Sequence, residues 1–222
     1  MTVPTTSAEH AASDVGDARQ SAKGTKLNKR GIATRQRLLD TAVQVLGEAN
    51  PSDVSANLVA RQAGVTWGTV QHQFGDADGL WAAVLDFVST GFPMLRPMDD
   101  VSVAGRVAQI VNGLWDFYDT VEARTVLNLR DTLPPNVDEL TRDYPLTAQG
   151  FAEWDRRWRR AYAKSFRGLV VDGYRLERVR NLLSVSVKAL HREPQLSTWT
   201  DIDQAREGLI EAVAEYLGRE PV

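Results

Sequence analysis

The chain has 222 residues, of which 43% are apolar and 25% charged, the balance of an ordinary folded protein with one domain or two small ones. It contains no cysteine, which excludes disulfides, thiolate metal sites and cysteine nucleophiles. No stretch approaches the ~20 uninterrupted apolar residues of a membrane span, and the N-terminus has no apolar run of signal-peptide length, so we expect a cytoplasmic protein.

Positive charge is concentrated near the N-terminus, although the net charge of the chain is -3. Between Arg19 and Arg61 the sequence holds eight lysines and arginines but only three acidic residues. Residues 1–26 have no periodic apolar face, so we expect a disordered arm with a basic end that includes Lys23 and Lys26. A local basic patch favours a phosphate-bearing partner; the alternative is ordinary variation in surface charge.

Three helices are predicted in the N-terminal third. From Gly31 to Leu46, apolar residues recur at three- and four-residue spacing, and the helix ends before Pro51 because the residue preceding a proline avoids the helical region. A short second helix follows, with Ser52, Asp53 or Ser55 as its cap. Gly64 supplies a turn, and Thr66 caps a third helix over residues 67–73.

The remaining two thirds are also predicted to be helical. Asp76 or Asp78 caps a fourth helix that runs to Val88. The proline-containing stretch from Pro93 to Asp100 is typical of a connection between two regions of the chain. Further helical patterns cover residues 103–118, 121–133, 147–170, 173–191 and 201–217, and no alternating strand pattern occurs. The predicted fold class is therefore all-α.

Two short helices joined by a tight turn behind a longer helix have the proportions of a helix-turn-helix. Val65 and Val70 are apolar and fix the third helix to the core, which leaves its polar residues on the outer face. Such a face suits contacts with phosphates and base edges; the alternative is a solvated helix face. A glycine weakens a helix, so Gly68 indicates close backbone approach to DNA or to another helix, or simple tolerance.

The segments ATRQRLLDTAVQVLGE and LVARQAGVTWGTVQHQFGDADGLWAAVLDFV resemble the N-terminal domain of the TetR family of bacterial transcriptional regulators, over roughly residues 30–90. The resemblance implies a homodimer with a helix-turn-helix head at residues 27–75 and a ligand-binding and dimerisation body at 76–222, in which 76–92 is a connecting helix. It also implies that a small-molecule effector moves this helix and releases double-stranded operator DNA. No cofactor is expected.

Three positions depart from the family pattern. The family usually has Tyr where this chain has Gln71, a phosphate-contacting Lys at Ala77, and His or Tyr at Gln73. The basic arm or nearby arginines are expected to supply the missing charge. The expected DNA-contacting residues are Arg30, Arg35, Ser55, Asn57, Thr66, Trp67, Gly68, Thr69, Gln71, His72 and Gln73.

Aromatic residues recur along one face of the helix predicted at residues 147–170. They are either core or the wall of a cavity for an apolar or aromatic ligand. The expected ligand-contacting residues are Phe92, Met94, Ile110, Trp115, Tyr118, Trp154, Trp158 and Tyr162. The last two helices form either monomer core or a dimer interface that includes Leu183, Val187, Leu190, Leu209 and Val213.

Catalysis has little support in the sequence. Three histidines and no cysteine make a metal site or thiol chemistry unexpected, and no G-x-S-x-G elbow or phosphate-binding glycine loop occurs. The predicted function is a ligand-responsive DNA-binding transcriptional regulator, a repressor released by a small apolar or aromatic ligand, and not an enzyme. The alternatives are an all-α small-molecule-binding protein with a vestigial DNA-binding head, and a helical enzyme.

Overall fold

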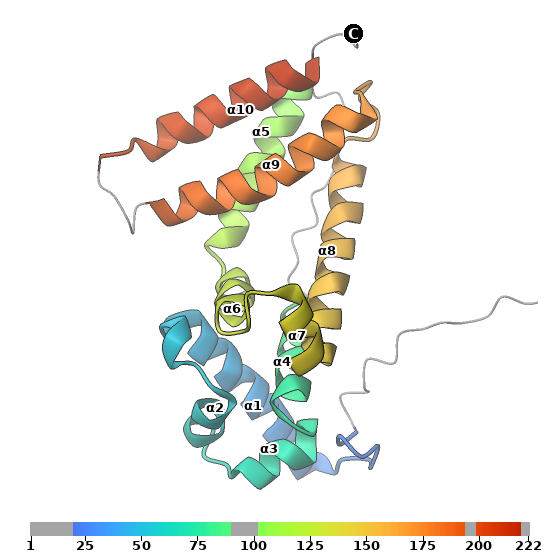
Figure 1. Cartoon of the computed structure of the whole chain (residues 1–222), viewed down its shortest axis with the longest axis vertical. Helices are drawn as coiled ribbons and strands as arrows, with labels where there is room; N and C mark the ends of the chain where they lie inside the picture. Colours follow the sequence, from blue (N-terminus) through green and yellow to red (C-terminus); the bar gives the residue numbers. More distant parts are fainter. Residues whose placement is uncertain (1–19, 90–101, 194–198, 219–222) are drawn as a thin grey trace, which may run out of the picture.

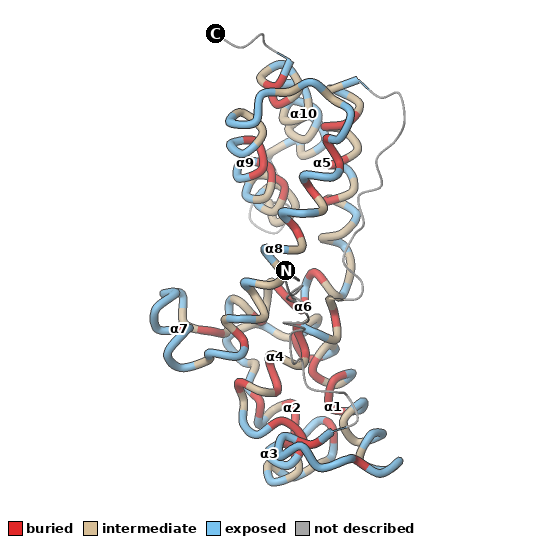
Figure 2. Tube along the Cα trace, turned by 90° about the vertical axis from the view of Figure 1, so that its right-hand side faces the viewer, coloured by how far each residue is buried: buried red, intermediate tan, exposed pale blue. Residues whose placement is uncertain are grey.

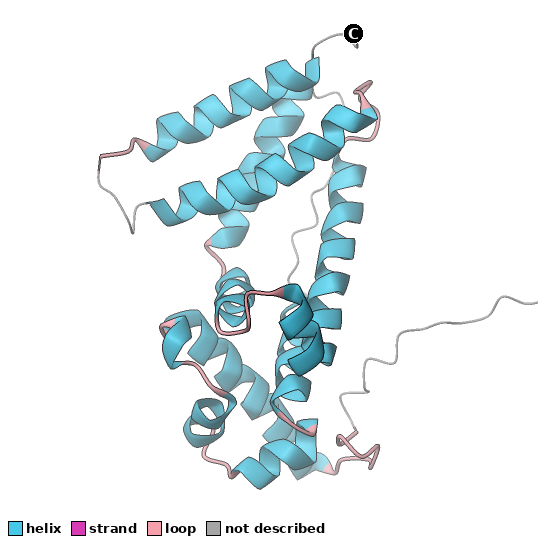
Figure 3. Ribbon diagram, in the orientation of Figure 1, coloured by secondary structure: helices cyan, strands magenta, loops and turns pink. Residues whose placement is uncertain are grey.

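The computed structural model describes residues 20–89, 102–193 and 199–218. In this part of the chain the secondary structure is helical, and no β-strand forms (Figure 3), so the all-α prediction is confirmed. The helices are α1 (Lys29–Glu48), the 3-10 turn η1 (Pro51–Asp53), α2 (Ala56–Gln62), α3 (Trp67–Phe74), α4 (Ala77–Val88), α5 (Val103–Tyr118), α6 (Val121–Asp131), α7 (Val137–Asp143), α8 (Pro145–Ser165), α9 (Gly173–Arg192) and α10 (Ile202–Gly218).

The helices form an elongated molecule with two lobes. Figures 1 and 2 show α1–α4 with α6 and α7 in one lobe, and α5, α9 and α10 in the other. Helix α8 runs along the side of the molecule from the first lobe into the second (Figure 1). α3 lies at the end of the long axis that is farthest from α9 and α10.

The first lobe is built around one apolar core. Leu38 and Leu46 of α1 and Leu80 of α4 are fully buried, and Leu129 of α6 and Leu140 of α7 complete the same cluster. The core that supports α1–α3 therefore extends past residue 75 and includes α6 and α7. Helix α7 has no counterpart among the predicted helices, because its seven residues contribute only Leu140 to the core and show no apolar periodicity.

A second apolar core lies between α5, the second half of α8, α9 and α10. Ile110, Tyr162, Leu183 and Val213 are buried in it, one from each of these helices. The first half of α8 instead packs against the first core, through Ala148, Phe151 and Trp154. Because both cores use α8, this helix connects the two lobes mechanically.

Helices α1 and α6 approach closely on the side of the first lobe that is nearer to α5 (Figure 1). Asn128 Nδ2 donates a hydrogen bond to the Leu46 carbonyl at 2.6 Å, and Thr125 Oγ1 donates to the Val43 carbonyl at 3.3 Å. A Cβ atom on Gly47 would lie 2.9 Å from Cγ2 of Val121, which is closer than unbonded carbons approach. Glycine at position 47 therefore sets the spacing of the two helices.

Replacing Gly47 with alanine is expected to lower the free energy of unfolding by about 1 kcal/mol, because overpacking outweighs the gain in helix propensity. Urea denaturation measures the change. Gly173→Ala is the matched control, since a Cβ there meets no atom within 4 Å. If Gly47→Ala were as stable as the control, the close approach of α1 and α6 would be contradicted.

Candidate nucleic-acid interface

The helix-turn-helix forms where the sequence predicts it, and side-chain caps start both of its helices. Ser55 Oγ accepts a hydrogen bond from the Leu58 amide at 3.2 Å at the start of α2, and Thr66 Oγ1 accepts from the Thr69 amide at 3.3 Å at the start of α3. Between the helices, Gly64 adopts a φ of +66°, a conformation that is strained for residues with a Cβ. The caps and the turn fix the entry angle of α3.

Helix α3 presents one polar and exposed face at the end of the molecule. Thr66, Gly68, Gln71 and His72 are exposed, and Thr69 is half-buried. The Thr66 and Thr69 hydroxyls lie 3.1 Å apart and form a hydrogen bond. On the opposite side of the helix, Val70 and Phe74 are buried in the first core, and Trp67 packs half-buried against it. Ser55, Asn57 and Arg30 are also exposed in this region.

Gly68 faces open space on this surface. The nearest atom to a Cβ built there is Thr66 Oγ1, at 3.8 Å. Packing of α3 against another helix in the described part of the chain therefore does not explain this glycine. Of the explanations left open by the sequence, close approach of an external partner and simple tolerance remain.

The prediction that Gln73 lies on the outer face is wrong. Gln73 is only 3% exposed, and its side-chain amide donates a hydrogen bond to the Gly31 carbonyl of α1 at 3.2 Å. Arg35 Nη1 donates to the Gln73 carbonyl at 2.7 Å, and its guanidinium lies 4.3 Å from the centre of the Phe74 ring. Burial lowers the pKa of Arg35 below its usual range. Both side chains thus hold α1 against the end of α3.

An ordered turn precedes α1, so the predicted disorder is wrong for residues 20–26; residues 1–19 lie outside the described part. Gln20 and Lys26 form an antiparallel bridge, and the Ala22 amide donates to the His72 carbonyl at 3.2 Å. The turn therefore rests on the C-terminal end of α3, and Lys23 and Lys26 are exposed on it.

The residues predicted to contact a ligand do not lie in one environment. Ile110, Trp158 and Tyr162 are buried in the second core. Trp115 and Tyr118 pack half-buried against that core, whereas Trp154 packs against the first. Phe92 and Met94 lie outside the described residues.

Two tyrosines near the second core are shielded from water. Burial raises the pKa of Tyr118 to about 12, and its hydroxyl donates to the Ser184 carbonyl at 3.5 Å. Burial also raises the pKa of Tyr162, whose hydroxyl has no hydrogen-bond partner within the described part of the chain. A buried hydroxyl without a partner is unfavourable by about 1–3 kcal/mol, so this group could pair with an acceptor on a bound molecule.

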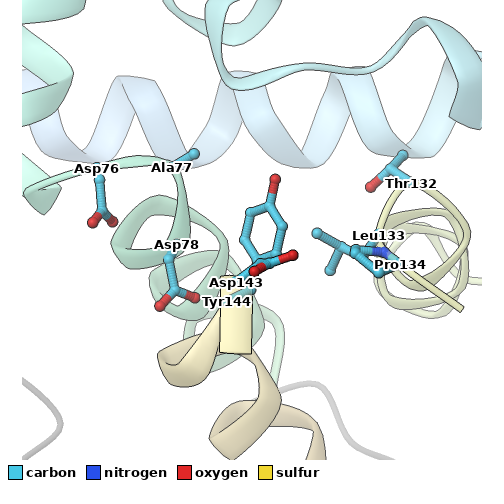
Figure 4. Close-up of a pocket in the computed structure, with 8 residues that line it drawn as sticks. All are labelled: Asp76, Ala77, Asp78, Thr132, Leu133, Pro134, Asp143 and Tyr144. Atoms are coloured by element: carbon cyan, nitrogen blue, oxygen red, sulfur yellow. The ribbon is translucent and has the colours of Figure 1, made fainter. Parts of the chain in front are cut away.

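A cleft of about 690 Å³ lies elsewhere, between the starts of α4 and α8 and the end of α6. Figure 4 shows Tyr144 between Asp78 on one side and Leu133 and Pro134 on the other. None of the residues predicted to contact a ligand lines it. Its carboxylates are already engaged: Asp76 caps α4, and Asp143 forms an ion pair with Arg142 at 2.8 Å.

The structure places the predicted dimer residues partly inside the protomer. Leu183, Val187 and Val213 are buried in the second core, so the expectation that they face a partner is wrong, while Leu190 and Leu209 are half-buried. The exposed aliphatic side chains of α9 include Leu182 (50% exposed) and Val185 (63%). The sequence prediction chose the inward face because both faces of α9 carry aliphatic residues.

Part of the sequence is similar to that of known transcriptional regulators. No model of a protein family matches the chain. Among curated proteins, the HTH-type transcriptional regulator BetI of Proteus mirabilis is 33% identical over 93 residues, which is 40% of this chain and 46% of that protein. BetI of Serratia proteamaculans is 31% identical over 87 residues, or 37% of this chain and 44% of that protein. The chain thus matches less than half the length of these relatives.

Solved structures share the fold over most of the chain. A protein from Vibrio parahaemolyticus assigned to the TetR family superposes with a TM-score of 0.55 and 21% identity, covering 84% of this chain and 100% of that one. The multidrug-binding protein EbrR, solved with imidazole, gives 0.55 and 20%, covering 90% and 98%. The chain therefore has the fold of TetR-family regulators, and the resemblance predicted from the sequence is confirmed.

No helix in the described part of the chain combines the length and apolar character needed to cross a membrane.

Proposed function

We propose that this protein is a DNA-binding transcriptional regulator whose α3 enters the major groove. The observation that carries the proposal is the exposed polar face of α3, held at one end of the molecule by side-chain caps and a buried apolar back. The similarity to BetI, a helix-turn-helix regulator, supports it. In a two-fold dimer, two such helices must stand ~34–36 Å apart to reach adjacent major grooves.

Selection of duplexes from a random DNA pool tests the proposal without knowledge of the operator. We expect one enriched, inverted-repeat sequence whose binding weakens steeply with salt, because phosphate contacts release counterions. A pool that yields no enriched sequence, or binding that ignores sequence at every salt concentration, would contradict it. The second outcome would favour a small-molecule-binding protein with a vestigial head, which the inward positions of Arg35 and Gln73 also favour.

Gln71→Ala is expected to reduce discrimination between the selected duplex and single-base variants by about 1 kcal/mol, roughly fivefold, since a side-chain amide reads base edges. Fluorescence anisotropy with each duplex measures the ratio. Gln204→Ala, at an exposed glutamine of α10, is the control and should leave the ratio unchanged. Equal discrimination in the two variants would remove Gln71 from the contact surface.

We further propose that a small aromatic or apolar effector enters the second core and that the outcome is repression. The aromatic rings of Trp158 and Tyr162 in α8 and of Phe166 at its C-cap follow one another, with ring centres 5.8 Å and 5.0 Å apart. The hydroxyl of Tyr162, which has no hydrogen-bond partner among the described residues, would then donate to an acceptor on the effector. A second copy of the chain would pack on the exposed apolar face of α9, at Leu182 and Val185.

A further inference from the structure

Helix α8 begins without a cap of its own. The residue before it, Tyr144, has φ −138° and ψ 61°, and its side chain forms no capping hydrogen bond. The helix starts with Pro145, so the amides of Leu146 and Thr147 are the first that need an acceptor. A helix of 21 residues also carries a partial positive charge at this end.

The missing cap is supplied by a residue of α4. Asp78 Oδ2 accepts from the Leu146 amide at 2.9 Å, and Oδ1 accepts from the Thr147 amide at 2.8 Å. The Thr147 hydroxyl lies 2.7 Å from the same Oδ1. Asp78 is 7% exposed and Thr147 is fully buried. A single carboxylate from 69 residues earlier thus satisfies the start of α8 in an environment with little water.

This carboxylate sits directly behind the candidate DNA surface. Asp78 is the second residue of α4, and only Gly75 and Asp76 separate α3 from α4. A Cβ on Gly79 would overlap the Phe74 carbonyl, so glycine at position 79 allows the end of α3 and the first turn of α4 to lie this close together. A displacement of the start of α8 that moves Asp78 would reach α3 through a connection of only two residues.

The other contacts between α4 and α8 run in the same direction along both helices. A Cβ on Gly150 would lie 2.9 Å from Leu85 Cδ1, and Arg157 Nη1 donates to Ser89 Oγ at 2.7 Å. Beyond this point α8 enters the second core through Trp158 and Tyr162. One continuous helix thus joins the second core to the Asp78 carboxylate.

We infer that Asp78 is the positioning residue that couples the second core to the recognition helix, through its hydrogen bonds to the N-terminus of α8. The inference rests on the proposed DNA-binding function. Coupling is reciprocal, so DNA bound at α3 must alter α8 by the same free energy with which a change at α8 alters DNA binding. The coupling can therefore be tested with DNA alone.

The experiment is hydrogen–deuterium exchange on the full chain, with and without the duplex obtained by selection. In the unaltered protein, DNA is expected to slow exchange of the amides in residues 154–165 about fivefold, within the usual range of coupling. In Asp78→Asn the amide group must place a donor against one of the two helix amides, and the effect of DNA should fall below about twofold. Thr147→Val, which leaves both amide–carboxylate bonds in place, should give an intermediate value.

Thr141→Val is the matched control, because the exposed Thr141 hydroxyl donates to the Val137 carbonyl within α7, and this variant should retain the full effect. Variants that bind the duplex yet keep the full DNA effect at residues 154–165 would overturn the coupling and leave the proposed function standing. If Asp78→Asn does not fold, the inference is tested with Thr147→Val and the unaltered protein. If DNA has no effect on exchange in α8 of the unaltered protein, the inference is also overturned. Failure to select any duplex overturns the proposed function and the coupling together.

Discussion

Gly68→Ala is expected to make the protein more stable and a weaker binder of DNA. Alanine raises helix stability by up to about 1 kcal/mol relative to glycine, and the added Cβ meets only Thr66 Oγ1, at 3.8 Å. On an approaching duplex the same methyl group would displace the backbone of α3 from the groove wall. Loss of one such contact costs about 1–3 kcal/mol, so we expect affinity to fall by about fivefold to 150-fold.

Urea denaturation and anisotropy with the selected duplex measure the two quantities on the same preparation. Gly173→Ala is the control, because this glycine also lies in the first turn of a helix, with no atom within 4 Å of its Cβ position. It should gain stability without a change in affinity. A Gly68→Ala protein with unchanged affinity would show that the glycine is merely tolerated and that DNA does not approach α3 there.

Arg35→Met is expected to change the stability of the protein, whereas Arg30→Met is expected to change the salt dependence of DNA binding. Arg35 makes a charged hydrogen bond to the Gln73 carbonyl and stacks on Phe74, so its loss should lower the free energy of unfolding by about 2 kcal/mol. Its guanidinium is already engaged, and the salt dependence of DNA binding should stay the same. Arg30 is exposed, so Arg30→Met should keep stability and reduce the slope of log K against log salt by about 0.9.

Thermal or urea unfolding, with affinities at four or more salt concentrations, separates these outcomes. Methionine is chosen in both variants because it keeps most of the apolar stem. If Arg35→Met lowered the salt slope and left stability unchanged, Arg35 would be a phosphate contact after all. In that case Lys23 and Lys26 of the N-terminal turn would not be needed as additional positive charges next to α3.

The sequence was sufficient for the helices of the head because their signals are local. Ser55, Gly64 and Thr66 act within four residues of themselves, as caps or as a turn, and each does so in the structure. The apolar spacing of α1 likewise predicts the buried residues Leu38 and Leu46. Such features depend on backbone chemistry that is visible in a short window of sequence.

The remaining parts could not be predicted because they depend on contacts between distant segments. From the sequence alone, Gln73 is predicted to be an outward-facing polar residue. In the structure α1 packs beside it, and its side-chain amide donates to the Gly31 carbonyl. The sequence indicates Asp78 only as a possible cap for α4, yet its carboxylate accepts hydrogen bonds at the start of α8, 69 residues later. Similarly, the choice between the two aliphatic faces of α9 required the position of α5, which buries Leu183 and leaves Leu182 exposed.

The participation of α8 in two cores has a consequence for how the chain can be divided. A fragment that ends near residue 92 would lack Val126, Leu129 and Leu140, and would expose the apolar surface of α1 and α4 that they cover. Its complement would lack the partners of Phe151 and Trp154. We therefore expect neither fragment to be as stable as the intact chain, because each loses apolar contacts that the other provides.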